Sequence, residues 1–230
     1  MKNDGKRKAH ENTTSAKLKE KQRAIREGFP TDMALRVHRS ISWLQRAEKE
    51  EGDPDAAFIF LWIAFNSAYA EDIPATPSSG ERTSFDAFFE RILAVDADHR
   101  IYDAIWHRFP RSIRLLLDNQ YVFQPFWHFQ NGIEGYEDWE TRFAKSRKKG
   151  QTALEKRDTR VILSTLFDRL YVLRNQLVHG GATWNGRVNR PQVRDGAAIL
   201  SFLLPLFIDL MMDNPSIALG APYYPVVDQD

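Results

Sequence analysis

The sequence predicts an all-α fold, an elaborated helical bundle. Apolar residues recur at the three- and four-residue spacing of helices along most of the chain, and no pair of alternating segments indicates β-strands. The sequence contains no internal repeat. A chain of 230 residues suits one domain and is long enough to bury a substantial core.

The chain divides into an N-terminal segment, a helical domain and a C-terminal tail. Residues 1–29 are polar, with nine basic and four acidic residues between Lys2 and Glu27. We expect this basic segment to be mobile, with at most a solvated helix over 16–26. Residues 30–214 form the expected helical domain, and residues 215–230 an extended tail.

Two long helices are expected at the start of the domain. Thr31 or Asp32 can cap the first helix. Its apolar face consists of Met33, Val37, Ile41 and Leu44. Asp53 followed by Pro54 predicts the N-cap and first position of the second helix, which runs to about residue 70. Because this helix is apolar around its whole circumference, it is either the central helix or a subunit interface.

The middle of the chain is expected to form shorter helices. Residues 74–80 are a loop by composition, and Ser84 can cap the helix that follows. Between 98 and 131 the helical pattern is interrupted at prolines. This region is dense in aromatic residues, namely Tyr102, Trp106, Phe109, Tyr121, Phe123, Phe126, Trp127 and Phe129. Such rings usually pack in a core, and base stacking is the alternative.

An amphipathic helical segment over 136–150 ends in a basic cluster. The cluster consists of Lys145, Arg147, Lys148 and Lys149. A second solvated stretch is expected up to Asp158, and Asp158 or Thr159 can cap the next helix. Basic residues in this pattern form either a solvated helix face or a surface that follows nucleic-acid phosphates. The basic cluster is therefore a candidate substrate-binding surface.

The next helix carries Arg174 and His179 near its end. Five residues on a helix correspond to about 140° of rotation and about 7.5 Å of rise, so the two side chains flank one groove. Gly180 and Gly181 predict the end of the helix. His179 should therefore lie in the last turn, beside unpaired carbonyl groups and within reach of solvent.

Composition excludes several classes of protein. The 32 Lys and Arg residues nearly balance the 31 Asp and Glu residues, so no overall basic field points to nucleic acid. The absence of cysteine excludes disulfides, thiol catalysis and Cys-ligated zinc, and fits a reducing compartment. We therefore expect a cytoplasmic protein.

Membrane, metal and nucleotide-loop signals are also missing from the sequence. A final helix is expected from Pro191. The two longest apolar runs, 56–65 and 197–212 within that final helix, are shorter than the roughly 20 residues of a membrane span. The charged N-terminus lacks the apolar core of a secretory signal. The six histidines have no zinc-helix spacing, and no P-loop or dinucleotide glycine pattern occurs. No metal and no cofactor are expected.

The run Arg174-Asn175-Gln176-Leu177-Val178-His179 resembles the Arg-x4-His signature of HEPN domains, many of which are metal-independent ribonucleases. The apolar helix before it, the glycines after it and the earlier run Phe-Leu-Trp-Ile-Ala-Phe-Asn-Ser-Ala-Tyr at 60–69 are similar to the Apea-like HEPN group. The resemblance spans roughly residues 31–212. It implies a HEPN-like bundle that acts on RNA in prokaryotic defence or as a toxin. It also implies a homodimer in which two motifs form one composite site.

The residue types of this motif suit RNA cleavage without a metal, because RNA carries its own nucleophile in the 2′-hydroxyl. Histidine can move the proton near neutral pH, and a forked arginine can bind the phosphate oxygens as charge builds. Arg174, Asn175 and His179 are the candidate catalytic residues. Asn66 is a candidate supporting residue, and the alternative for it is a hydrogen bond within the core.

Other interpretations stay open at the level of sequence. An arginine and a histidine at this spacing also occur as a surface cation and a carbonyl-capping histidine. The chain could be a non-catalytic HEPN-like module that binds RNA, nucleotide or a protein partner, or a structural bundle. HEPN toxins with a nucleotidyltransferase antitoxin commonly continue the motif as His-x-Tyr, whereas this sequence reads His179-Gly180-Gly181. The tyrosine is the modified residue in those toxins, so its absence argues against regulation by that modification, and an antitoxin is one candidate partner.

Overall fold

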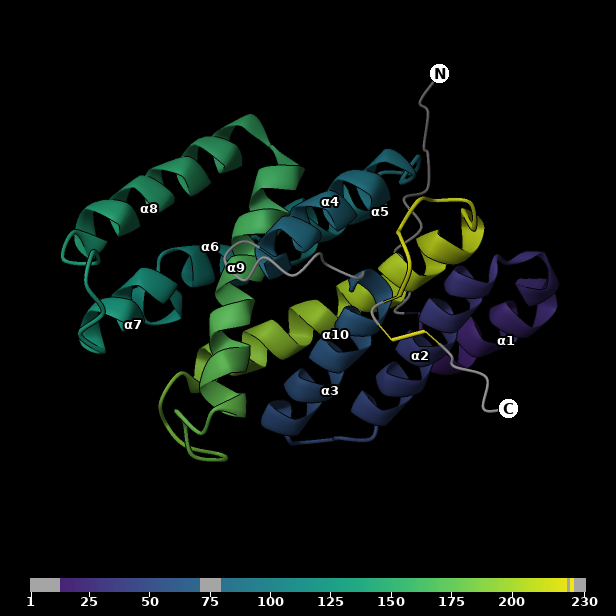
Figure 1. Cartoon of the computed structure of the whole chain (residues 1–230), viewed down its shortest axis with the longest axis horizontal. Coiled ribbons are helices and arrows are strands. Elements are labelled where there is room, and N and C mark those ends of the chain that lie inside the picture. The colour runs from purple at the N-terminus through teal and green to yellow at the C-terminus, as the bar shows by residue number, and fades with distance from the viewer. Residues whose placement is uncertain (1–12, 71–79, 223, 226–230) are drawn as a thin grey trace, which may run out of the picture.

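The computed structural model describes residues 13–70, 80–222 and 224–225, with the side chains of 80–84 left aside (Figure 1). Within these ranges the secondary structure is helical and no strand forms, which confirms the all-α prediction. The α-helices are α1 (Ser15–Ile25), α2 (Thr31–Ala47), α3 (Pro54–Tyr69), α4 (Gly80–Ala94), α5 (Arg100–Asp103), α6 (Pro110–Leu117), α7 (Gln124–Gln130), α8 (Trp139–Lys156), α9 (Thr159–Val178) and α10 (Arg190–Asp213). Short 3-10 helices cover Arg26–Gly28 and Gln120–Val122, and a π-helical turn covers Ala104–Arg108.

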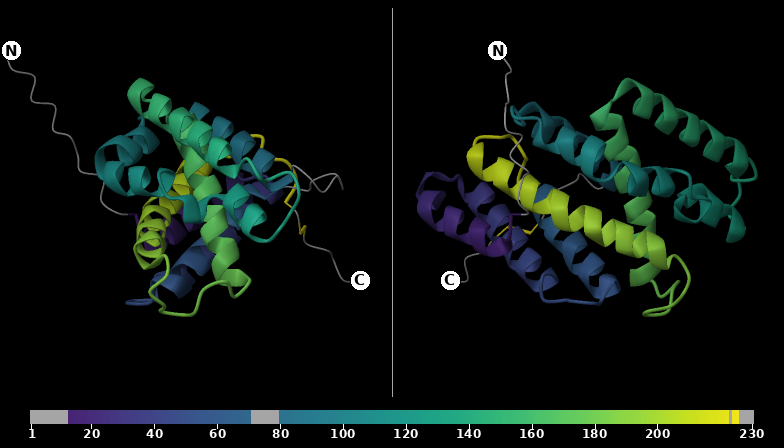
Figure 2. Two further views of the ribbon diagram at one scale, coloured as in Figure 1. Left: turned by 90° about the vertical axis from the view of Figure 1, so that its left-hand side faces the viewer. Right: turned by 180° about the vertical axis from the view of Figure 1, so that it is seen from behind.

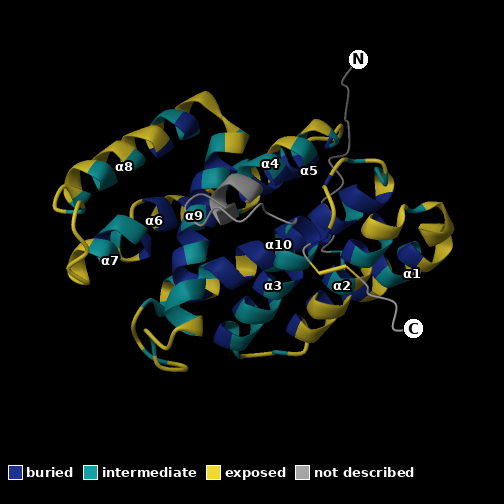
Figure 3. Ribbon diagram, viewed as in Figure 1, coloured by how far each residue is buried: buried dark blue, intermediate teal, exposed yellow. Residues whose placement is uncertain are grey.

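The core forms where α3 packs between α2, α10 and α9 (Figure 3). Trp62 and Phe65 of α3 are almost fully buried and contact the rings of Phe85 and Phe167. Phe207 of α10 closes the same cluster. The helix predicted to be either central or interfacial is therefore a core helix. The partly exposed large apolar residues of α3 are Ile59, Phe60 and Ile63.

Helices α6, α7 and α8 lie on the other side of α9 from α2 and α3 (Figures 1 and 2). Sequence reasoning ended an amphipathic helix at Gly150 and expected a solvated stretch beyond it, but α8 continues to Lys156. Gly150 is buried, and a Cβ atom there would lie 3.5 Å from Leu117. The helix therefore continues through the glycine because this position packs against α6.

Local capping signals were right at some helices and wrong at others. Asp53 accepts hydrogen bonds from the backbone of Asp55 and Ala56, and Asp158 accepts one from Val161, so both predicted N-caps are confirmed. At α2 neither Thr31 nor Asp32 caps the helix, because Thr31 is already its first residue and Pro30 precedes it. Helix α4 begins at Gly80 rather than after Ser84, and the rest of the expected 74–80 loop lies outside the described residues.

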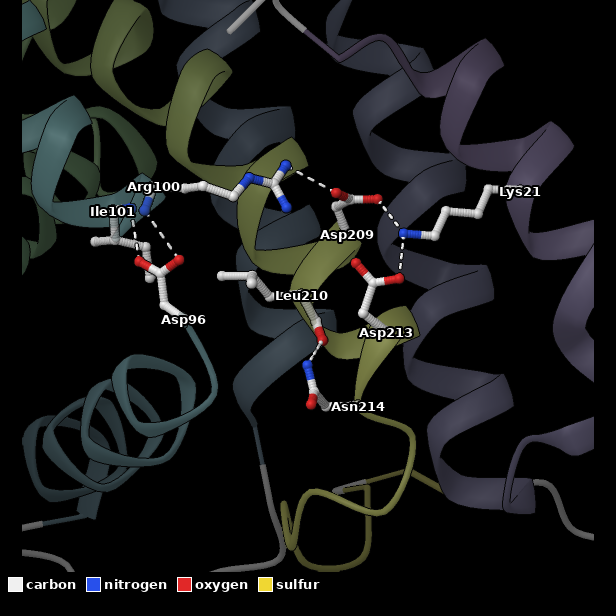
Figure 4. Close-up of polar contacts among 8 residues, drawn as sticks. All are labelled: Lys21, Asp96, Arg100, Ile101, Asp209, Leu210, Asp213 and Asn214. Carbon is white, nitrogen blue, oxygen red and sulfur yellow. Dashed lines mark hydrogen bonds and ion pairs between the residues drawn. The ribbon is translucent and has the colours of Figure 1, made fainter. Parts of the chain in front are cut away.

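The described part of the N-terminal segment packs on the bundle instead of being solvated. Leu18 of α1 is fully buried, and the Ser15 backbone N–H donates to Glu48 at the end of α2 at 2.8 Å. Lys21 lies 2.6 Å from the carboxylates of both Asp209 and Asp213 on α10 (Figure 4). These long-range contacts explain why a helix with little apolar surface of its own is ordered. Residues 1–12 lie outside the described part of the chain.

Asp209 is the centre of this polar network, because Arg100 of α5 also binds it at 2.7 Å (Figure 4). Burial, the largest single effect, raises the pKa of the Asp209 carboxyl, but the hydrogen bonds and charges of Lys21 and Arg100 together leave the pKa below its usual value. Because the folded pKa is depressed, this carboxylate stabilises the fold above its unfolded pKa, and the contribution is lost as the pH falls through the folded value.

We expect Asp209→Asn to lower the free energy of unfolding by on the order of 2 kcal/mol at neutral pH, because the partly buried Lys21 and Arg100 lose a charged acceptor. The difference from the wild type should begin to shrink as the pH falls below about 4, where the carboxyl of the unfolded chain takes up a proton first, and should be lost as the pH falls through the depressed folded pKa of Asp209. Thermal unfolding measured from pH 3 to 7 tests this. Asp213→Asn is the matched control, since Asp213 is half exposed and binds Lys21 alone. A constant difference at all pH values would contradict the assignment.

The described part of the C-terminal tail runs back along α2 and is held by Arg36. This side chain is only 1% exposed. It donates to the carbonyl oxygens of Ala68 and Ala70 at the end of α3, and to those of Leu219, Gly220 and Ala221 in the tail. The described part of the tail, residues 215–222 and 224–225, is therefore docked on the bundle.

Helix α10 is long and apolar enough in composition to cross a membrane, and 72% of its apolar window is buried inside the fold. Its buried residues contact α2, α3 and α9. Pro205 lies within the helix and is itself buried. The length and composition of α10 are therefore explained by its place in the core of the bundle.

Candidate active site

The C-terminal end of α9 has the form that the two glycines predict. Gly180 has a φ of +70°, its N–H donates to Leu177, and the Gly181 N–H donates to Gln176 at 2.7 Å. This pair of hydrogen bonds is a Schellman ending, in which the residue before the left-handed glycine is the C-cap. His179 is that residue, and its side chain is exposed. The helix end therefore presents the imidazole to solvent, as expected.

Arg174 and Asn175 contact each other one turn earlier. The Arg174 guanidinium donates to the Asn175 side-chain oxygen at 2.9 Å and lies 5.6 Å from the centre of the Tyr171 ring. Tyr171 in turn contacts the buried ring of Trp62. Within the described residues Arg174 has no carboxylate partner, so its charge is available to an anion. The side chain of His179 makes no hydrogen bond or ion pair within the same part of the chain.

The loop after the motif is fixed to the start of α3. The Trp184 indole N–H donates to Asp53 at 2.8 Å, and the Asn185 backbone N–H donates to Asp55 at 2.8 Å. Arg190 at the start of α10 also binds Asp55, at 2.7 Å. The backbone N–H of Ala56 and the indole N–H of Trp184 hold the pKa of the Asp53 carboxyl below its usual range. The loop that follows His179 is therefore tied to the start of α3 at its middle and where α10 begins.

Gln176, inside the motif, connects α9 to two other segments. Its side-chain N–H donates to the Tyr121 carbonyl oxygen at 2.7 Å, and its oxygen accepts from the Asn189 side chain at 2.7 Å. Tyr121 and Asn189 both line an open cleft of about 720 Å³, here called the Tyr121 cleft. Its other lining residues are Leu115, Leu116, Asp118, Asn119, Gln120, Arg187, Pro191, Gln192 and Asp195. The motif therefore borders a cavity on its Gln176 side.

The basic cluster on α8 is exposed, and its residues differ in their distance from the motif. Arg147 binds Asp118, a residue of the Tyr121 cleft, at 2.8 Å. Ser146 accepts a hydrogen bond from the buried Arg169, which is ten residues before His179 and therefore about 15 Å away along α9. Lys145, Lys148 and Lys149 are exposed on the same helix, without a contact to the motif. Among the described residues, Arg147 is the member of the cluster with an ion pair to a residue of the cleft.

Asn66 does not contact the motif. Its side-chain oxygen is buried without a hydrogen-bond partner, and so is the indole N–H of Trp62, one turn earlier on α3. Trp62 contacts Tyr171, whose ring centre lies 5.6 Å from the Arg174 guanidinium. The core hydrogen bond considered as the alternative does not form either.

Sequence reasoning missed Gln176, Asn189 and Asp55, and it named Tyr121 only as one of eight aromatic residues that could stack on a base. Gln176 bonds to residues that are 55 and 13 positions away, and no local pattern signals such contacts. Within the described ranges no group of three or more His, Asp or Glu side chains could hold a metal ion. Comparison with protein-family models, with curated proteins and with solved structures finds no match to this chain.

Proposed function

We propose that this protein is an endoribonuclease that needs no metal ion and cleaves RNA through attack of the 2′-hydroxyl. The observation that supports the proposal best is the end of α9, where an exposed C-cap His179 follows the paired Arg174 and Asn175. Arg174 supplies an always-charged fork without a carboxylate partner in the described residues. A histidine exposed to solvent is available for proton transfer near neutral pH.

The reaction forms a bond between the 2′-oxygen and phosphorus and breaks the bond between phosphorus and the 5′-oxygen. The 2′-hydroxyl gives up a proton to a base, and the leaving 5′-oxygen receives one from an acid. The products are a 2′,3′-cyclic phosphate and a 5′-hydroxyl. We assign proton transfer to His179, binding of the non-bridging phosphate oxygens to Arg174, and orientation of the guanidinium to Asn175. By the resemblance to HEPN proteins, this activity serves prokaryotic defence or acts as a toxin.

We expect cleavage to continue in EDTA and to leave 2′,3′-cyclic phosphate and 5′-hydroxyl ends, because the proposed groups act without a metal. The measurement is incubation of the purified protein with mixed RNA in EDTA, followed by analysis of the termini. An RNA with a 2′-O-methyl group at each nucleotide is the control, since it has no nucleophile. Cutting of the methylated RNA, strict dependence on Mg²⁺, or RNA binding without any cleavage would each reject the proposal.

The proposal includes a two-fold dimer in which two motifs face one phosphate. In-line displacement needs groups on both sides of the phosphorus, and one helix end supplies them on one side only. Large apolar side chains are exposed around the motif: Val178 is 53%, Trp184 74% and Val188 69% exposed. Apolar side chains grouped on a surface are typical of an interface. A second copy of the chain would cover them and bring a second His179 to the site.

We expect Val188→Asp to convert an active dimer into a monomer with little cleavage activity, because it places a charge in the proposed interface. Light scattering at the assay concentration, together with the cleavage assay, measures both effects. The matched control is Ile133→Asp, since Ile133 is 45% exposed in the loop after α7. A wild-type protein that is monomeric while it cleaves RNA would rule out the composite site.

A further inference from the structure

The Tyr121 cleft combines a flat apolar wall with polar groups that have no partner. Leu115 and the Tyr121 ring form the apolar side and are 54% and 49% exposed. Gln120, Gln192, Asp195 and Arg187 also line the cleft, and none of their side chains has a hydrogen bond or ion pair within the described residues. Amides, a carboxylate and a guanidinium placed around an exposed ring suit a planar ligand with polar edges.

Tyr121 is held in place although its ring is exposed. Its carbonyl oxygen accepts hydrogen bonds from the Trp127 indole at 2.8 Å and from Gln176 at 2.7 Å, and its N–H donates to Asn119 at 2.8 Å. Its ring lies perpendicular to the ring of Phe126 at a centroid distance of 5.5 Å. A fixed, half-exposed ring loses little entropy when a base stacks on it. The stacking alternative for the aromatic segment is therefore reasonable at this residue.

The position of the cleft relative to the motif follows from Gln176. This residue contacts two walls of the cleft and lies three positions before His179, about 60° from it around α9. Arg174 lies about 160° from Gln176, toward Tyr171. A phosphate beside His179 would therefore have the cleft on one flank and Arg174 on the other. That is the arrangement needed for a nucleotide whose base enters the cleft while its phosphate stays at the motif.

We propose that the Tyr121 cleft binds the base of the nucleotide next to the scissile phosphate, and that guanine is the preferred base. This rests on the proposed RNA cleavage. Guanine carries two adjacent N–H donors, which suit the Asp195 carboxylate, and the O6 and N7 acceptors, which suit an arginine fork such as Arg187. Uracil has one N–H donor between two carbonyl groups, so the carboxylate disfavours it.

The test is binding of guanosine 3′-monophosphate and uridine 3′-monophosphate to the full chain, measured by calorimetry. We expect the guanosine nucleotide to bind more tightly to the wild type. Tyr121→Ala should weaken its binding about tenfold or more, because the stacking surface is lost. Tyr121→Phe keeps the ring and the backbone contacts, and should bind within about twofold of the wild type. Asp195→Asn should remove the preference for guanosine over uridine, because the amide offers a donor as well as an acceptor.

Equal binding of both nucleotides to the wild type, or unchanged guanosine binding by a folded Tyr121→Ala variant, would overturn the proposal. Failure of the cleft and failure of the ribonuclease proposal can be told apart. If the nucleotide binds as expected but the wild type cuts no RNA, the proposal for the Tyr121 cleft is supported and the ribonuclease proposal is wrong. If RNA is cut and Tyr121→Ala leaves KM and base preference unchanged, the ribonuclease proposal is supported and the proposal for the Tyr121 cleft is wrong.

Discussion

Replacing His179 or Arg174 with alanine is expected to lower RNA cleavage by about a thousandfold or more for each variant. Loss of a positioned proton-transfer group typically costs 10²–10⁴-fold, and loss of a transition-state cation costs a similar factor. Stability should hardly change. His179 is exposed at a helix end, and Arg174 is only half buried, so truncation creates no cavity in the core.

The cleavage rate of both variants tests the expected loss of activity, and their thermal unfolding tests the expected lack of change in stability. Matched controls are His107→Ala and Arg111→Ala, which remove an exposed histidine and an exposed arginine far from the motif along the chain. Both controls should cleave like the wild type. A folded His179→Ala or Arg174→Ala protein with wild-type activity would remove the proposed catalytic pair, and equal losses in the controls would show that the effect is not specific.

The helical fold class and the end of α9 could be predicted from the sequence because both depend on local signals. A capping aspartate before proline starts α3, a capping aspartate starts α9, and the left-handed Gly180 ends α9. Each of these signals acts through neighbouring backbone groups. The same local reasoning failed at α1, where order depends on Lys21 binding Asp209, 188 residues away. It also failed at Gly150, whose packing against Leu117 outweighs its low helix propensity.

The candidate site was predictable only in part, for the same reason. The motif residues lie within six positions of one another, so one helix places Arg174, Asn175 and His179 together. The Tyr121 cleft is assembled from α6, the Gln120–Val122 turn and the start of α10. Asn66 is a candidate by sequence because it interrupts an apolar helix, but its buried side-chain oxygen has no hydrogen-bond partner. A local sequence pattern can identify a candidate residue. The residues that surround it in space depend on how helices distant in sequence pack, and the local pattern does not predict this.

Arg36→Met is expected to be among the most destabilising single substitutions in the chain. The Arg36 guanidinium donates to five backbone carbonyl oxygens at 2.7–3.3 Å, two at the end of α3 and three in the tail at 219–221. Methionine fills similar space but donates no hydrogen bond, so buried carbonyl groups lose their partners. We expect a loss of about 3–5 kcal/mol, which corresponds to a fall in Tm of about 10 °C for a chain of this size.

The tail should also separate from the bundle in this variant, since three of the five bonds hold it there. Limited proteolysis followed by mass spectrometry should detect faster cleavage between Ile217 and Ala221 in Arg36→Met than in the wild type. Arg39→Ala is the matched control, because Arg39 binds the Tyr224 carbonyl oxygen at 2.6 Å from an exposed position and should change stability by only about 0.5 kcal/mol. An Arg36→Met protein with unchanged Tm and a protected tail would show that these carbonyl groups find other donors, and that Arg36 does not hold the tail on the bundle.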